Sequence, residues 1–237
     1  MKLLNGDCLK LMQEIPDGAV DLILCDLPYG TTDCSWDDVL PFGELWEQYD
    51  RLLKPDGAAV LFSAQPFTTQ LIMSNKKAFR YCWYWIKNTQ TGFPFARYQP
   101  MRKIEDICVF YRKHGTYNPQ GLKVAKNAKP RRKQDVPTIY QMSKLSKEYT
   151  PKFTNWPKNV LEYNSERGYH PTQKPVPLLE YLVRTYTNEG DTVLDNCMGS
   201  GSTGVAVKRV GGRHFIGIEQ NKVYFDIAQE RIEKEQP

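Results

Sequence analysis

The feature that most constrains the fold is a short apolar run that ends in a carboxylate. Residues 20–25 are mostly aliphatic and include β-branched side chains, which is typical of a strand buried on both faces of a parallel sheet. The next four residues are Asp26-Leu27-Pro28-Tyr29. Open α/β sheets bind ligands at the carboxyl ends of their strands, so an acid and a ring in this place predict a functional site. A plain turn uses the same residue types, and this stretch alone does not separate the two.

A second strand, loop and helix lie near the C-terminus. Residues 191–195 read as a strand ending at Asp195, and residues 202–210 as a helix. Between them, residues 199–204 fit G-x-G-x-x-G, and Glu219 follows Gly201 by 18 residues. This spacing is a dinucleotide-binding fingerprint, in which glycines admit the ligand and the acid takes ribose hydroxyls. An NAD enzyme is therefore a rival interpretation, although the 18 residues after Glu219 are too few for a second nucleotide-binding half.

Strand and helix patterns alternate along most of the chain. Further strands are expected at residues 2–5, 58–62, 79–86, 104–111 and 214–218. Further helices are expected at residues 8–14, 41–53, 66–74, 176–186 and 222–234. This alternation predicts an α/β fold with a wound, mostly parallel sheet and one antiparallel strand near its edge. The polar residues 87–92, expected to form a loop, are a candidate DNA contact.

Positive charge is concentrated in one segment. Residues 112–158 hold twelve Lys and Arg against two acids, a net charge of +10, whereas the remainder of the chain carries −5. The segment also contains five prolines and interleaved aromatic residues. We interpret residues 113–159 as a loop-rich basic insertion that meets a polyanion, with a solvated or disordered linker as the alternative. The densest charge lies at Lys129, Arg131, Arg132 and Lys133.

The bulk composition excludes several classes of protein. The six cysteines show no C-x-x-C pair and no regular spacing, so neither a metal site nor a disulfide framework is expected. The sequence shows no signal-peptide pattern and no apolar stretch approaching the ~20 residues of a membrane span. A cytoplasmic protein with reduced thiols is the expectation.

Three motifs together resemble those of the S-adenosylmethionine-dependent amino-methyltransferases of DNA. They are DLPYG at residues 26–30, HPTQKP at 170–175 and DNCMGSGSTG at 195–204. The catalytic motif precedes the cofactor glycines, which is the order of the circularly permuted β class. The resemblance implies a Rossmann-like class I methyltransferase fold: a mostly parallel seven-stranded sheet with helices on both faces. It covers residues 1–112 and 160–237 as one catalytic and cofactor-binding domain, with residues 113–159 as an inserted target-recognition region.

The resemblance also implies the site residues. The catalytic residues are Asp26, Leu27, Pro28 and Tyr29, in a motif whose usual form has proline where this chain has Leu27. An exocyclic amine gives its hydrogens to the Asp26 carboxylate and the Leu27 carbonyl, Pro28 holds that carbonyl, and Tyr29 stacks on the base. The expected S-adenosylmethionine contacts are Asp7, Cys8, Asp26, His170, Thr172, Gln173, Lys174, Asp195, Met198, Gly199, Ser200, Gly201, Ser202, Thr203 and Glu219. Among these, Asp26 and Asp195 are expected near the cofactor's ammonium and residues 172–174 near its carboxylate, while Asp7 also suits a helix N-cap.

The expected reaction is site-specific methylation of the 6-amino group of an adenine flipped out of double-stranded DNA. An Asp in the first motif position is more typical of adenine than of cytosine 4-amino modifiers, and both alternatives stay open. RNA or protein methylation and a non-catalytic DNA-binding role are further alternatives, the last supported only by Leu27. Dimers are common in the family, yet no apolar stripe marks an interface here. A homodimer and a restriction endonuclease partner are left open by the sequence.

Overall fold

The computed structural model describes residues 1–30, 38–126, 128–132, 148–166, 168–169 and 172–236. These form two units, one of residues 1–118 with 159–237 and one of residues 119–158. The composition placed the insertion at residues 113–159. The second unit holds two short antiparallel pairs, β6 (Lys123–Val124) with β9 (Phe153–Thr154), and β7 (Arg131–Arg132) with β8 (Glu148–Tyr149).

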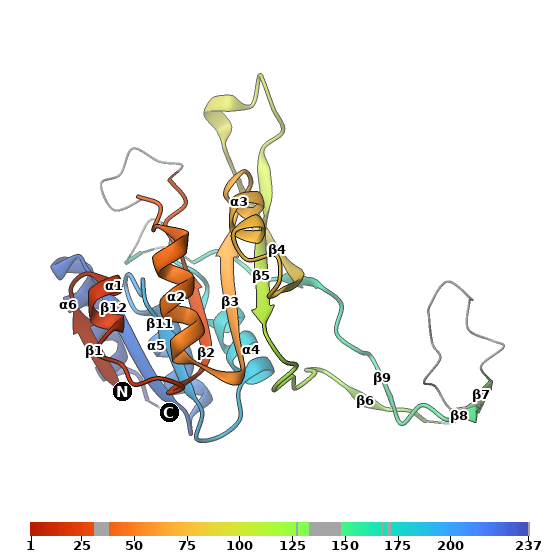
Figure 1. The fold of residues 1–237 in the computed structure, drawn as a ribbon. Helices are drawn as coiled ribbons and strands as arrows, with labels where there is room; N and C mark the ends of the chain where they lie inside the picture. The colour runs from red at the N-terminus through yellow and green to blue at the C-terminus, as the bar shows by residue number, and fades with distance from the viewer. Residues whose placement is uncertain (31–37, 127, 133–147, 167, 170–171, 237) are drawn as a thin grey trace. The chain divides into compact units, whose positions relative to one another are not determined.

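The first unit is built on an eight-stranded sheet with the order β1-β12-β11-β2-β3-β5-β4-β10 (Figure 1). The strands are β1 (Lys2–Asn5), β2 (Val20–Asp26), β3 (Leu53–Ser63), β4 (Phe79–Thr91), β5 (Arg102–Tyr111), β10 (Val160–Glu162), β11 (Thr192–Asp195) and β12 (His214–Glu219). All neighbours pair in parallel except β5, which is antiparallel to both β3 and β4. The predicted α/β fold with one antiparallel strand is confirmed.

The predicted count of seven strands differs from the observed sheet. The eighth strand, β10, follows the second unit and pairs in parallel with β4, Val160 opposite Tyr84. It has only three residues, of which Leu161 is buried and its two neighbours are exposed. A strand this short carries too little alternation to be recognised in a sequence.

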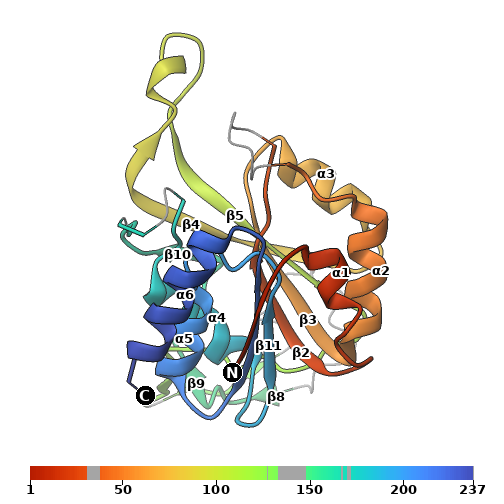
Figure 2. The same ribbon diagram turned by 90° about the vertical axis from the view of Figure 1, so that its left-hand side faces the viewer.

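Helices cover both faces of the sheet, as Figure 2 shows. One face carries α1 (Cys8–Met12), α2 (Phe42–Leu52) and α3 (Phe67–Ser74), and the other carries α4 (Val176–Tyr186), α5 (Ser202–Val210) and α6 (Lys222–Lys234). Successive side chains of a strand point to opposite faces. Accordingly Leu22 and Leu24 of β2 belong to one core cluster, and Ile23 and Cys25 belong to the other.

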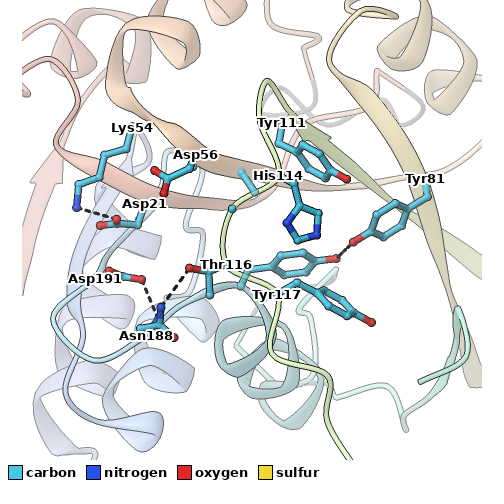
Figure 3. A pocket seen from close by; sticks show the side chains of 14 residues that line it. Asp21, Lys54, Asp56, Tyr81, Tyr111, His114, Thr116, Tyr117, Asn188 and Asp191 are labelled. Carbon is cyan, nitrogen blue, oxygen red and sulfur yellow. Dashed lines mark hydrogen bonds and ion pairs between the residues drawn. The ribbon is translucent and has the colours of Figure 1, made fainter. Parts of the chain in front are cut away.

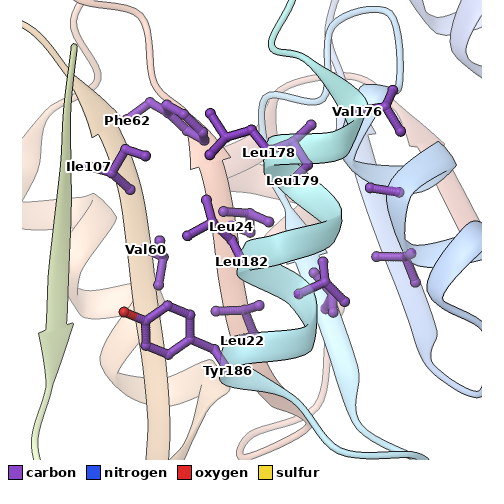
Figure 4. Packing of buried hydrophobic residues seen from close by; sticks show 14 of the residues in the cluster. Leu22, Leu24, Val60, Phe62, Ile107, Val176, Leu178, Leu179, Leu182 and Tyr186 are labelled. Atoms are coloured by element: carbon purple, nitrogen blue, oxygen red, sulfur yellow. The ribbon is translucent and has the colours of Figure 1, made fainter. Parts of the chain in front are cut away.

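The α4 helix shows how this packing arises from the sequence. Leu178, Leu179 and Leu182 have the spacing of one helical stripe and are at most 2% exposed. Figure 4 shows this stripe facing Leu24 of β2 and Phe62 of β3. Among the described residues, no helix is both long and apolar enough to cross a membrane.

The central strands β11 and β2 are neighbours, with Val193 opposite Leu22 and Leu194 opposite Ile23. After β11 the chain continues to β12 on one side, and after β2 it continues to β3 on the other. The chain order therefore diverges between these two strands, which is the topological switch point where doubly wound sheets bind ligands. Both strands end in an aspartate, Asp195 and Asp26.

Candidate active site

A cavity of about 470 Å³ lies at the carboxyl ends of β2, β11 and β12. This volume is within the range of small-molecule sites in proteins. The predicted site residues among its lining are Cys8, Asp26, Leu27, Pro28, Tyr29, Thr172, Gln173, Lys174, Asp195, Met198, Gly199, Ser200, Ser202, Thr203 and Glu219. The fold thus brings together residues from both ends of the chain.

Asp26, the last residue of β2, is held by two side chains. Tyr29 donates its hydroxyl to Oδ1 at 2.7 Å, and Lys174 donates its ammonium to Oδ2 at 2.5 Å. The Tyr29 ring stacks on Phe67 at a centroid distance of 5.1 Å, which fixes the ring from the protein side. Leu27 is 3% exposed. The carboxylate is therefore fixed in orientation before any ligand arrives.

Lys174 belongs to a chain of alternating charges. Its Nζ also lies 3.5 Å from Oε2 of Glu105, and Oε1 of Glu105 accepts a hydrogen bond of 2.8 Å from Lys87. The side chains of Lys174, Lys87 and Glu105 are only 7%, 9% and 15% exposed. Such a buried array is costly to desolvate and tolerates the loss of any partner poorly.

This array sets the protonation of the site. Burial raises the pKa of Asp26 above its ordinary value, and the Lys174 ammonium offsets only part of that effect. Burial disfavours the charged form of Lys174, but Asp26 and Glu105 outweigh it and raise the lysine's pKa. The pKa of Glu105 is lowered, because Lys174 and Lys87 overcome the effect of burial.

Glu105 and Lys87 are site residues that the sequence interpretation missed. Glu105 of β5 lies opposite Trp85 of β4, and Lys87 is two residues further along β4. A charged residue inside a predicted buried strand was the available signal, since such charges need a partner. The prediction that residues 87–92 form a loop was wrong, because β4 runs to Thr91. Within that strand, Lys87 is paired with Glu105.

The glycine loop turns the chain from β11 into α5. Gly199 and Gly201 have φ of 50° and 80°, a region that suits glycine. A Cβ on Gly201 would lie 2.8 Å from the Cβ of Ala228, so glycine also permits the close approach of α6. The Gly199 amide donates to Oε2 of Glu219 at 2.8 Å, and the Asn221 amide donates to Oε1 at 2.7 Å. Burial raises the pKa of Glu219 above its ordinary value.

Asp195, the last residue of β11, is a buried carboxyl of the cavity. It is 3% exposed, and burial raises its pKa to about 7, although hydrogen bonds from Thr203 and from the Cys197 amide oppose the shift. The Cys197 amide lies 3.1 Å from its Oδ1. A cation placed beside this carboxyl would stabilise the ionised form.

Other predicted residues lie in different surroundings. Asp7 caps α1, accepting from the amides of Leu9 at 2.9 Å and Lys10 at 3.4 Å, and is not among the residues that line the cavity. Gln173, which lines the cavity, also bridges Glu166 and the Tyr169 amide. The predicted cofactor contact His170 lies outside the described residues.

The predicted DNA-binding residues belong to the second unit. Lys129 is exposed, and Arg131 and Arg132 form strand β7. Lys133 lies outside the described residues. Their role on DNA stays a prediction.

A second cavity, of about 260 Å³, lies at the other edge of the sheet, where the parallel strands β2 and β11 begin (Figure 3). Lys54 pairs with Asp21 at 2.7 Å, and Asn188 donates to Thr116 at 3.2 Å. The hydroxyls of Tyr81 and Tyr186 are 2.9 Å apart. These lining groups bind one another, which favours a structural role for this edge.

The donor set of the larger cavity fits S-adenosylmethionine. Glu219 presents a carboxylate at a strand end beside the glycine loop, which is the arrangement that takes ribose hydroxyls in dinucleotide-binding folds. Asp195 presents a buried carboxyl whose raised pKa a cation would relieve. Among the described residues, no cluster of three or more His, Cys, Asp or Glu side chains is arranged for a metal ion.

Comparisons with known proteins agree with this geometry. Residues 20–230 match the family model described as DNA methylase, which groups N6- and N4-methyltransferases. The Type II methyltransferase M.HpaI of Haemophilus parainfluenzae is 28% identical over 249 residues, covering 99% of this chain and 74% of that protein.

Two solved structures share the fold. The M1.HpyAVI–SAM complex has a TM-score of 0.67 at 24% identity and covers 98% of each chain. The cytosine-N4-specific PvuII DNA methyltransferase has a TM-score of 0.69 at 17% identity, covering 97% of this chain and 85% of that one. Site and family model lead to one conclusion: the chain belongs to the DNA methylase family of S-adenosylmethionine-dependent N6- and N4-methyltransferases.

Proposed function

We propose that this protein methylates the 6-amino group of adenine in DNA at a specific sequence. The observation that carries the proposal is the Asp26 carboxylate, half-buried at the switch point and fixed by Tyr29 and Lys174 beside the predicted cofactor pocket. A carboxylate in this place accepts hydrogens from an amine and does not itself need to be a strong base. Fixed placement is a large part of catalysis when the reacting groups are both bound.

S-adenosylmethionine, when bound, supplies a methyl group on a positively charged sulfur. We assign its ammonium to Asp195, its ribose to Glu219, and its adenine end to the pocket wall near Cys8, all of which line the cavity. The Gly199 amide holds Glu219 in position at 2.8 Å. Gly201 lets α6 approach the loop, which shapes the floor of the pocket.

The target amine is activated by geometry. Each Asp26 oxygen already accepts one hydrogen bond, and a carboxylate oxygen has a second acceptor site for the amine hydrogen. The Leu27 carbonyl takes the other hydrogen, so the nitrogen lone pair turns out of the ring plane. The bound cofactor would supply its methyl group to this nitrogen, and Asp26 is positioned to accept the proton that the amine then loses. The raised pKa of Asp26 favours that proton transfer.

The target base reaches this site only when it leaves the duplex, at a cost of a few kcal/mol. The Tyr29 ring, which stacks on Phe67, is proposed to stack on such a base. Stacking of a base on an aromatic ring contributes about 1–3 kcal/mol, which offsets much of the cost. The insertion is proposed to recognise the sequence around the target.

Adenine is preferred over cytosine because the motif begins with Asp26. The fold does not decide between the bases, since the cytosine-N4-specific PvuII enzyme shares it. The test is incubation of the protein with unmethylated DNA and methyl-labelled S-adenosylmethionine, followed by digestion to nucleosides and mass spectrometry. Label in 6-methyladenine supports the proposal, whereas label in 4-methylcytosine reverses the base assignment.

We further propose that the protein is part of a restriction–modification system. It is supported by the relative M.HpaI, which is named a Type II methyltransferase. Plasmid DNA recovered from cells that express the protein should resist an endonuclease of the same sequence specificity. A homodimer stays a prediction from the resemblance.

A further inference from the structure

The tip of the β4–β5 hairpin presents aromatic rings to solvent. Phe93, Phe95 and Tyr98 are 76%, 55% and 87% exposed. Phe93–Phe95 form a single 3-10 turn, introduced by Gly92 with φ of 91°. Figures 1 and 2 both show the hairpin projecting well beyond the rest of the sheet. A group of large apolar side chains held out in this way marks an interaction surface.

The tip is also cationic. Between Gly92 and Ile104 the chain has Arg97, Arg102 and Lys103 and no acidic residue. Rings combined with guanidinium and ammonium groups are the chemistry of nucleic-acid binding, because rings stack on bases and cations pair with phosphates. An apolar groove on a protein partner would not require the excess of positive charge at the tip.

The hairpin starts from the wall of the active site. Glu105 of β5 lines the larger cavity, and the chain from Glu105 back to Tyr98 leads away from it. Residues 102–105 belong to β5 and Tyr98 lies in the turn before it, so this stretch spans less than the roughly 23 Å of seven extended residues. The major groove of DNA is about 12 Å wide. A duplex whose target base enters the cavity is therefore within reach of the tip.

We infer that the tip, defined as Phe93, Phe95, Arg97 and Tyr98, binds the DNA duplex beside the target base and stacks on bases left unpaired by its extrusion. The inference rests on the proposed function, since it names a second contact to the same substrate. The proposed DNA contact then lies at the end of the hairpin and not at Lys87, whose ammonium is paired with Glu105. The tip and Tyr29 then have separate roles, one on the opened duplex and one on the extruded base.

The test compares Phe93→Ala/Tyr98→Ala with the wild type on two oligonucleotide duplexes containing the mapped target sequence. One duplex is fully paired, and the other has an abasic site opposite the target base. On the paired duplex each lost stack should lower kcat/KM by about 5- to 150-fold. On the abasic duplex, where no pair has to be opened, the loss should be at least about fivefold smaller.

Two variants serve as controls. Tyr98→Phe keeps the ring and should retain activity, and Met73→Ala removes an apolar side chain of similar exposure on α3 and should change nothing. Thermal midpoint and cofactor affinity should match the wild type in all variants, because the replaced side chains are exposed.

Two results overturn the inference: unchanged kinetics on the paired duplex, with or without a loss of self-association, or an equal loss on both duplexes. Anisotropy of labelled duplex with S-adenosylhomocysteine present separates the two proposals. If the wild type methylates no DNA but the double variant still weakens duplex binding, the proposed reaction fails while the contact stands. If neither kinetics nor binding changes, the contact fails alone.

Discussion

At the scale of single residues, the site depends on how Asp26 is held. Sequence resemblance assigned Lys174 to the cofactor carboxylate, whereas the structure pairs its ammonium with Asp26 and Glu105. This partnership joins a residue at the end of β2 with one 148 positions later. Motif spacing carries no information about such a contact, which only the folded sheet creates.

Opposite shifts in pH dependence are expected from the two neighbours of Asp26. Lys174→Met removes the cation that lowers the pKa of Asp26, so the acidic limb of the pH–rate profile should move to higher pH. Glu105→Gln removes an anion that raises this pKa, so the limb should move to lower pH. In Lys174→Met the carboxylate is also misplaced, which should lower the methyl-transfer rate by about 100-fold. Single-turnover rates at saturating cofactor measure both effects, and shifts in the same direction would contradict the account.

Cofactor binding should depend on the ionisation of Asp195. Its pKa of about 7 means that binding of the cofactor's ammonium must ionise this carboxyl at lower pH. The dissociation constant should therefore rise by up to about tenfold per pH unit below pH 7. Asp195→Asn should remove that dependence, as should methylthioadenosine, which lacks the ammonium. Calorimetric titrations from pH 5.5 to 8.5 measure it, and an unchanged slope in the variant would refute the assignment.

The same ionisation affects folding. The pKa of Asp195 is near 4 in an unfolded chain and about 7 in the folded one. The folded state therefore binds the proton more tightly, and stability falls as pH rises from about 4 to 7. Asp195→Asn removes this loss, so the variant also reports on the pKa in the absence of ligand.

At the scale of elements, the strands and helices of the first unit were largely predictable from periodicity. The stripe Leu178, Leu179 and Leu182 and the alternation in residues 22–25 each specify one buried face. The glycine loop and Glu219 were recognisable from spacing, and the structure joins them by one hydrogen bond. The short β10 and the hairpin tip were not predictable, since three residues of strand and an exposed turn carry no periodic signal.

Gly204 and Gly43 should respond in opposite directions to the same substitution. A Cβ on Gly204 of α5 would lie 2.3 Å from Cδ1 of Ile232 and 2.8 Å from Cε1 of Phe215. Gly204→Ala should therefore lower the free energy of unfolding by about 1–3 kcal/mol. A Cβ on Gly43 of α2 meets nothing within 4 Å, so Gly43→Ala should raise it by up to about 1 kcal/mol. Urea denaturation measures both, and equal signs would contradict the packing described.

At the scale of the whole molecule, charge separates the two units. The second unit, residues 119–158, carries +8, and the rest of the chain carries −3. A site that must receive a polyanion at a half-buried carboxylate needs its attraction elsewhere, and we propose that the basic insertion and the hairpin tip provide it. The target sequence that the second unit is proposed to recognise was not predictable, because base-edge contacts in irregular loops follow no pattern.

DNA affinity should lose salt dependence when the insertion loses charge. Arg131→Gln/Arg132→Gln should reduce the slope of log affinity against log salt by up to about two. The control Lys76→Gln/Lys77→Gln removes two exposed lysines of the first unit and should leave the slope unchanged. Anisotropy titrations at several salt concentrations give the slopes. An effect confined to the control pair would place the phosphate contacts elsewhere.

The central claim is that Asp26 positions the target amine in a cofactor pocket formed largely by other residues. The most direct measurement compares Asp26→Ala with the wild type in single-turnover methyl transfer to DNA and in S-adenosylmethionine affinity. Glu105 keeps Lys174 paired in the variant, so the pocket should persist. We predict that transfer is abolished while the cofactor still binds within about tenfold of the wild type. Full transfer activity in Asp26→Ala would contradict the account.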